Sequence, residues 1–239
     1  NQPIRTVVIK NWPNEEFLYH VFLRLNTGSV PLSPQELRQA LHPGFFVSFL
    51  DKESSKSIAL REILKLSKPD FRMRDAELLL RYFAFKNYLA NYSGTLKKFL
   101  DETCNKLNQG WDEKEEKIKE QLISFELAHQ RIKDIFKGKQ YRKWGEGEYE
   151  TRFNRAIFDV MILSFENSEV RELSEGSEEV IEQAFKELCS DNTRFLASIE
   201  STTKSLTSTH TRLSLWFAKV NEVLNTNLHV PQLEDNRIL

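Results

Sequence analysis

Cysteine, glycine and proline are scarce in this chain, and each shortage excludes a class of structure. The two cysteines, Cys104 and Cys189, are too few for a disulfide framework and lack the paired spacing of a zinc site. We expect both to be reduced thiols in the core of a cytoplasmic protein. Only 8 glycines and 7 prolines occur in 239 residues, which argues against a glycine-punctuated sheet and favours helices.

Long apolar runs and an excess of one charge are also missing. No stretch approaches the roughly 18 uninterrupted apolar residues that a bilayer span needs, and no secretion signal opens the chain, so we expect no membrane contact. Lys and Arg number 34 against 35 Asp and Glu. This balance excludes a basic protein that coats nucleic acid through its overall field, and any contact with nucleic acid has to be local.

Apolar residues, and phenylalanine above all, are abundant. The apolar share is 40% and there are 17 phenylalanines, so the chain can bury a large core. We therefore predict a mainly α fold in which the helices pack through aromatic side chains.

The first 45 residues differ from the rest. Residues 4–9 form a β-branched run that predicts a short strand, and no comparable strand follows. Because the chain also starts without methionine, we expect the rest of this sheet upstream of Asn1, in a longer protein. A helix over residues 14–25 and a loop lead to Ser33 and Glu36, which form a capping box for a helix that ends at His42. Residues 1–45 are predicted to be the C-terminal end of an α/β domain, and residues 46–239 a helical domain.

Apolar residues at three-and-four spacing predict the helices of the second part. These helices are expected over residues 57–66, 75–92, 94–108, 111–137, 149–165, 178–188 and 209–224. The last of them carries Trp216, Phe217 and Val220 on one face. If that stripe were exposed, it would indicate a surface for a partner subunit.

Residues 22–41 read FLRLNTGSVPLSPQELRQAL, an unusual order of turn and polar residues. This segment resembles the hallmark of the family called domain of unknown function 262, the module that opens GmrSD-type modification-dependent restriction enzymes of bacterial anti-phage defence. Weaker similarity continues through FRMRD at 71–75, ELLLR at 77–81 and FNRAIF at 153–158.

The resemblance implies a nucleotide-dependent system whose catalytic parts lie elsewhere. In such proteins the upstream half has a ParB-like α/β fold with an Asp-Gly-Gln-Gln-Arg motif, and many members end in a His-Asn-His nuclease. Neither motif occurs in this sequence. We therefore expect no catalytic residue and no cofactor in this chain, and NTP with Mg²⁺ in the complete protein. The implied partners are DNA and the missing upstream domain or a separate catalytic subunit; homo-oligomer formation stays open.

Two groups of residues are candidates for binding. The first group lies where a predicted helix ends in a turn, which brings together a guanidinium, a side-chain amide and backbone N–H groups. These donors suit a phosphate. The group consists of Arg24, Asn26, Thr27 and Gly28, with Arg38 from the next helix. The alternative is structural: Asn26 and Gly28 form an ordinary helix C-cap, and Arg24 forms an ion pair with Glu36 or another acid.

The second group is a basic segment with interleaved aromatic residues, which suits phosphates and unstacked bases. It consists of Lys137, Lys139, Tyr141, Arg142, Lys143 and Trp144. Three glutamates follow at positions 146, 148 and 150, so a charged helix end is the competing interpretation. The histidines are scattered, and no metal site is expected.

Arginines also cluster around the start of the helix expected over residues 75–92. Glu77 and Arg81 stand four residues apart, which predicts an intrahelical ion pair within a salt-bridge network. Contact of Arg72 and Arg74 with DNA phosphates is the alternative.

Together these patterns predict a helical sensor or regulatory portion of a nucleotide-dependent anti-phage protein, which contributes to DNA recognition and to its coupling with nucleotide turnover. The alternative hypothesis is a non-catalytic protein-interaction scaffold subunit of a defence complex.

Overall fold

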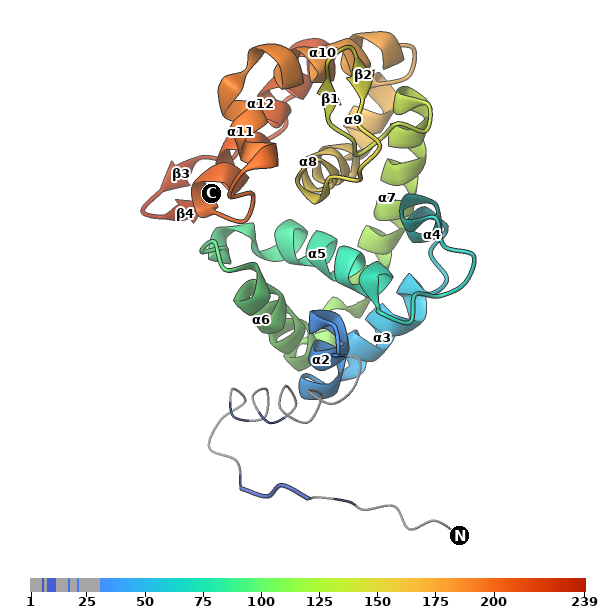
Figure 1. Cartoon of the computed structure of the whole chain (residues 1–239), viewed down its shortest axis with the longest axis vertical. Helices are drawn as coiled ribbons and strands as arrows, with labels where there is room; N and C mark the ends of the chain where they lie inside the picture. The colour runs from blue at the N-terminus through green and yellow to red at the C-terminus, as the bar shows by residue number, and fades with distance from the viewer. Residues whose placement is uncertain (1–5, 7, 12–16, 18–20, 22–30) are drawn as a thin grey trace.

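Helices make up most of the chain. The computed structural model describes residues 6, 8–11, 17, 21 and 31–239. Within this part there are eleven α-helices, one 3₁₀ helix and two short strand pairs (Figure 1). The mainly α fold class is confirmed. Of the strand predicted over residues 4–9, Thr6, Val8 and Ile9 are described and lie outside any strand.

The helices have the following bounds: α2 (Pro34–Leu41), α3 (Phe45–Ser54), α4 (Ile58–Leu64), α5 (Arg74–Tyr88), η2 (Leu89–Asn91), α6 (Leu96–Gln109), α7 (Trp111–Phe136), α8 (Arg155–Phe165), α9 (Ser168–Leu173), α10 (Glu178–Asp191), α11 (Thr193–Glu200) and α12 (Leu206–Leu224). Two antiparallel hairpins pair β1 (Trp144–Gly145) with β2 (Glu148–Tyr149), and β3 (Leu233–Glu234) with β4 (Arg237–Ile238).

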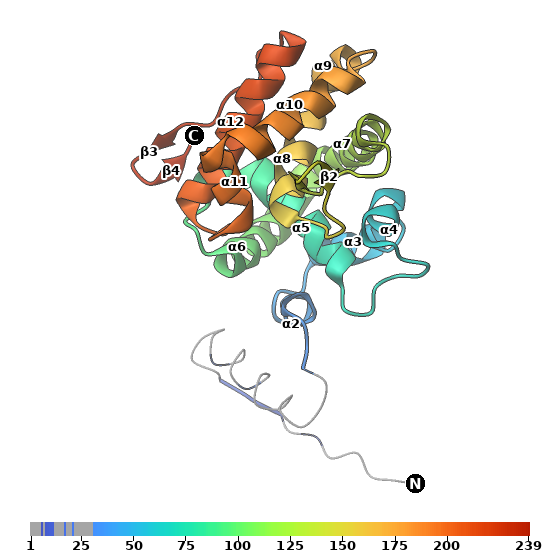
Figure 2. The same cartoon turned by 45° about the horizontal axis from the view of Figure 1, so that its top comes forward.

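Helix α5 lies across the middle of the molecule (Figure 1). It contacts α3, α4 and α6 on one side and α8 on the other. Helix α7 contacts elements of both groups, from α3 and α4 to α8 and α10. Turning the molecule places α8 beside α5, with α10, α11 and α12 beyond it (Figure 2). The start of α8 is therefore close to the centre of the fold.

Aromatic side chains fill the core, as the abundance of phenylalanine predicted. Phe46 and Phe83 pack edge to face with ring centroids 5.9 Å apart, and Phe185 meets Trp216 at 5.7 Å. Each such pair contributes about 0.5–1.5 kcal/mol beyond the burial of its area. Trp216 and Val220 are both buried, so the apolar stripe of the last helix faces the core and offers no surface to a partner.

Polar caps fix where several helices begin. Ser33 accepts a hydrogen bond from the Glu36 amide, and the Glu36 carboxylate accepts one from the Ser33 amide. The predicted capping box of α2 is confirmed. The side chains of Ser57, Asn154 and Ser205 cap α4, α8 and α12 by accepting hydrogen bonds from first-turn amides.

The helix predicted over residues 149–165 is wrong at its start. Tyr149 belongs to β2, and the helix begins only at Arg155. The cause is the turn before it: Glu146 has φ 53° and Gly147 φ 84°, the left-handed pair of residues that a two-residue hairpin requires. Helices α3, α9 and α11 were not predicted; α9 and α11 have 6 and 8 residues, too few turns to display a clear periodic pattern.

Both cysteines are free and buried, and burial raises the pKa of each thiol to about 12. No helix in the described ranges is long and apolar enough to cross a bilayer.

Candidate anion-binding site

Most of the predicted phosphate cluster lies outside the described residues, namely Arg24, Asn26, Thr27 and Gly28. Arg38 is described, and its guanidinium is engaged within the fold. Its Nε donates to Asp101 Oδ1 at 2.7 Å and its Nη1 to Gln35 Oε1 at 2.5 Å, while the side chain is only 2% exposed. Arg38 therefore joins α2 to α6, and its charge is already neutralised by a carboxylate.

The arginines before α5 are engaged as well. Arg72 donates to the Pro31 carbonyl at 2.7 Å and lies 3.3 Å from the Glu36 carboxylate. Arg74 pairs with Asp70 at 2.5 Å. These contacts agree with the predicted salt-bridge network and leave the alternative of DNA contact without structural support.

The basic segment at residues 137–144 divides into buried and exposed parts. Tyr141 was predicted to stack on bases, but its side chain is buried and its hydroxyl lies 3.0 Å from His129 Nδ1. Burial also raises the Tyr141 pKa well above its usual value. The structure does not support the predicted stacking role of Tyr141, because protein atoms cover the ring faces that a base would need.

Trp144 is half-buried and packs against Tyr149, with centroids 5.0 Å apart. Lys143 lies 2.6 Å from both Glu150 and Glu200, and these hydrogen bonds raise its pKa. The remaining candidates of this group, Lys137, Lys139 and Arg142, form no ion pair with the described residues. Their predicted contact with DNA stays a prediction.

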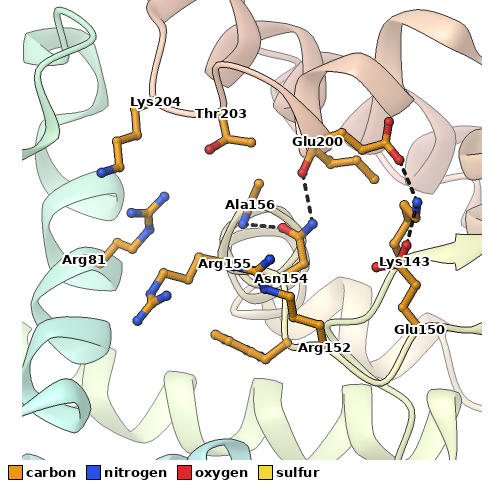
Figure 3. A pocket seen from close by; sticks show the side chains of 12 residues that line it. Arg81, Lys143, Glu150, Arg152, Asn154, Arg155, Ala156, Glu200, Thr203 and Lys204 are labelled. Atoms are coloured by element: carbon orange, nitrogen blue, oxygen red, sulfur yellow. Dashed lines mark hydrogen bonds and ion pairs between the residues drawn. The ribbon is translucent and has the colours of Figure 1, made fainter.

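A cavity of about 520 Å³ opens beside this segment. It lies between α5, the first residues of α8 and the loop that follows α11 (Figure 3). Its basic lining residues, apart from Lys143, are Arg81, Arg152, Arg155 and Lys204. Arg152, Arg155 and Lys204 are exposed, and none of the three pairs with a carboxylate in the described part of the chain.

Asn154 fixes the geometry at the start of α8. Its Oδ1 accepts hydrogen bonds from the amides of Ala156 and Ile157, at 2.9 and 3.3 Å. Its Nδ2 donates to the Ile199 carbonyl at 3.0 Å, which ties α8 to α11. Arg152 and Arg155 flank this cap, so their positive charges add to the positive end of the helix dipole. An anion at this position would relieve that accumulation of charge.

Arg81 lies at the inner wall of the cavity. Its Nε and Nη2 donate to the two carboxylate oxygens of Asp159, each at 2.5 Å. The predicted pair with Glu77 is therefore wrong: a carboxylate from α8 outcompetes the one a turn away, because two parallel hydrogen bonds in a buried site are stronger than a solvated pair.

Asp159 also serves a second arginine. Arg212 Nη2 lies 3.4 Å from Asp159 Oδ2, and Arg212 Nη1 donates to the Thr203 carbonyl at 2.7 Å. The Nε of Arg212 is buried without a hydrogen-bond partner. We call Arg81, Asp159 and Arg212 the buried triad; two guanidinium groups and one carboxylate leave it with one uncompensated positive charge.

The pKa values of the two arginines reflect this imbalance. Burial lowers the pKa of Arg212 to about 10; the Asp159 carboxylate opposes that shift, and the charge of Arg81 adds to it. For Arg81, burial likewise disfavours the charged form, but the charge and hydrogen bonds of Asp159 outweigh it and raise the pKa. Both guanidinium groups are thus charged at neutral pH, and that of Arg81 lines the cavity.

The chemistry of the lining suits binding. It contains no histidine, cysteine or serine, and both of its glutamates pair with Lys143. Among the residues with described side chains, no three carboxylates, histidines or cysteines gather in a way that could hold a metal ion.

Sequence reasoning missed Arg152, Arg155, Lys204 and Arg212 as site residues. A local signal for the first two exists: an asparagine that caps a helix stands between two arginines, in Thr-Arg-Phe-Asn-Arg at residues 151–155. Lys204 and Arg212 have no such signal, because only the tertiary fold brings them to α5 and α8.

No protein-family model, curated protein or solved structure matches this chain.

Proposed function

We propose that the cavity at the start of α8 binds a phosphate-bearing ligand, and that this chain is the helical recognition portion of a nucleotide-dependent anti-phage protein. The observation that carries the proposal is the unbalanced positive charge of the cavity. Arg152, Arg155, Lys204 and the net charge of the buried triad all converge there without a carboxylate partner. Guanidinium groups are the side chains best suited to phosphate oxygens.

The resemblance of residues 22–41 to domain of unknown function 262 supplies the wider setting of the proposal. Two of its weaker segments, residues 77–81 and 153–158, contribute Arg81, Asn154 and Arg155 to the cavity. In this setting the ligand is a nucleic acid or a nucleotide, and NTP hydrolysis belongs to another domain or subunit. DNA recognition and its coupling to that hydrolysis are the proposed role of this chain.

Charge reversal tests the location of the site. We expect Arg152→Glu combined with Arg155→Glu to weaken binding of a fluorescein-labelled single-stranded oligonucleotide by about a hundredfold, since each lost charge-assisted contact costs about 1.5 kcal/mol or more. Fluorescence anisotropy measures this loss. The matched control, Lys137→Glu combined with Lys139→Glu, changes the net charge equally at exposed lysines outside the cavity and should cost less than about threefold.

The opposite pattern would contradict the cavity as the site. If the Lys137 and Lys139 variant lost binding while the Arg152 and Arg155 variant kept it, the phosphates would lie on the exposed basic segment. If no oligonucleotide or nucleotide bound the unaltered chain, the proposal of a phosphate-bearing ligand would fall altogether.

A second candidate function, a protein-interaction scaffold, rests on a different surface. Ile123 and Leu127 stand one turn apart on α7 and are both exposed. Exposed Ile58 starts α4 beside them, since its neighbour Ala59 donates to Glu126 at 3.0 Å. Such a cluster favours contact with another protein. Salt-independent assembly that Leu127→Glu abolishes would support this function.

A further inference from the structure

The inner wall of the cavity presents one guanidinium nitrogen of Arg81 that makes no hydrogen bond within the described part of the chain. Arg81 gives Nε and Nη2 to Asp159, its side chain is 6% exposed, and its Nη1 forms no hydrogen bond with the described residues. In Figure 3 the guanidinium of Arg81 lies on the α5 side of the cavity, between the side chains of Lys204 and Arg155. Nη1 is not one of the buried side-chain atoms that lack a partner, so it is accessible from the cavity and can donate to an acceptor that enters there.

The two sides of the cavity carry opposite chemistry. Arg81 and Lys204 lie on one side, and Lys143 with Glu150 and Glu200 lies on the other, with Arg155 between them (Figure 3). The two glutamates are partly exposed despite their bonds to Lys143. They would repel a second phosphate that followed the first across the cavity. A continuous strand that crossed from side to side would therefore meet attraction at one end and repulsion at the other.

The backbone at the start of α8 contributes little to the ligand. Asn154 already occupies the amides of Ala156 and Ile157. The ligand therefore depends on side-chain cations, namely Arg81, Arg152, Arg155 and Lys204. Contacts of this kind scale with the charge of the phosphate group. A phosphomonoester carries about −1.5 to −2 at neutral pH, whereas an internal phosphodiester carries one negative charge.

From these three observations we infer that the cavity recognises a terminal phosphomonoester, at the end of a nucleotide or of a nucleic-acid strand, in preference to internal phosphodiesters. The inference rests on the proposed function, because it names which phosphate the same site selects. The terminal phosphate has three free oxygens and lies against Nη1 of Arg81. The rest of the ligand extends out of the cavity past Arg152, Arg155 and Lys204. The ligand never passes Glu150 and Glu200.

The test compares oligothymidylates of eight nucleotides that differ only in a 5′-phosphate or 5′-hydroxyl, each labelled at the 3′ end and titrated with the full chain. We expect the 5′-phosphorylated strand to bind about tenfold more tightly, the effect of one charge-assisted contact. Thymidine 5′-monophosphate and inorganic phosphate serve as competitors. Competition by the mononucleotide as strong as that of the strand would assign the terminal phosphate to free nucleotides; competition by the strand alone would assign it to strand ends.

Variants keep the test independent of folding. Arg155→Gln and Lys204→Gln alter exposed side chains, and each should reduce the tenfold preference toward unity without a change in melting temperature. Lys139→Gln, which removes an exposed charge outside the cavity, should leave the preference intact.

Suppose that both strands bind with equal affinity and that the charge reversal at Arg152 and Arg155 abolishes binding. This result would overturn the inference and leave the proposed function standing. No binding of either strand or of the mononucleotide would overturn both. Inhibition by inorganic phosphate alone, with no binding of nucleotides, would also overturn the inference, since the site would then hold a free ion.

Discussion

Arg81 and Arg212 share a single carboxylate, Asp159, at the centre of the molecule. All three side chains are at most 6% exposed. A buried ion pair adds little to stability when it is complete, because desolvation offsets the attraction. Loss of one partner is different, since it leaves a buried charge uncompensated. The triad is therefore a point at which one substitution has a large effect.

Asp159→Asn tests this arrangement. We expect the free energy of unfolding to fall by about 3–5 kcal/mol, because two guanidinium groups would then remain buried without a counter-ion. The control is Glu77→Gln, which removes the carboxylate that sequence spacing assigned to Arg81; its cost should stay below about 0.5 kcal/mol. Urea denaturation followed by circular dichroism measures both values. Equal losses in the two variants would contradict the pairing of Arg81 with Asp159.

At the scale of elements, helix α8 packs in the core and its first residues also form one wall of the cavity. Asn154 joins the two roles, because it caps the helix and holds the Ile199 carbonyl of α11. Substitutions at this position should therefore separate stability from binding.

We expect Asn154→Ala to lower the free energy of unfolding by about 2 kcal/mol, roughly half from the lost cap and half from the lost bond to Ile199. Asn154→Asp keeps the cap, since aspartate serves as well at this position, and should cost about 1 kcal/mol. Its carboxylate would face Arg152 and Arg155, so oligonucleotide affinity should fall more in Asn154→Asp than in Asn154→Ala. Thermal denaturation ranks the two variants by stability, and anisotropy titrations rank them by affinity. If Asn154→Ala were the weaker variant in both measurements, the role of charge at the cap would be contradicted.

The sequence predicted some elements correctly and others not, depending on whether a local pattern determines them. The capping box at Ser33 and the apolar spacing of α7 are local patterns, and both predictions agree with the structure. The start of α8 was misplaced because a hairpin turn at Glu146 and Gly147 interrupts the chain before it. The cavity could not be predicted at all, since its residues come from α5, α8 and the loop after α11. The partner of Arg81 lies 78 residues away, and spacing within a helix cannot reveal such a pair.

At the scale of the whole molecule, the nearly balanced charge makes the cavity stand out. The chain carries a formal net charge of −1, so its overall field does not attract nucleic acid. Local attraction comes from a few cations that face one volume. The salt dependence of binding therefore reports how many phosphates the protein contacts, and it distinguishes the cavity from a broad basic surface.

We expect the logarithm of the binding constant for the 5′-phosphorylated oligonucleotide to fall with the logarithm of salt concentration at a slope no steeper than about −3. The slope for a single strand is about −0.7 for each neutralised phosphate charge, and the cavity offers Arg152, Arg155, Lys204 and the net charge of the buried triad. Anisotropy titrations between about 50 and 200 mM salt, the range over which such slopes are resolved, give the value. A slope steeper than about −5 would require additional phosphate contacts, for which the nearest unpaired cations along the chain are Lys137, Lys139 and Arg142. A slope near zero would exclude phosphate contacts and favour the scaffold function.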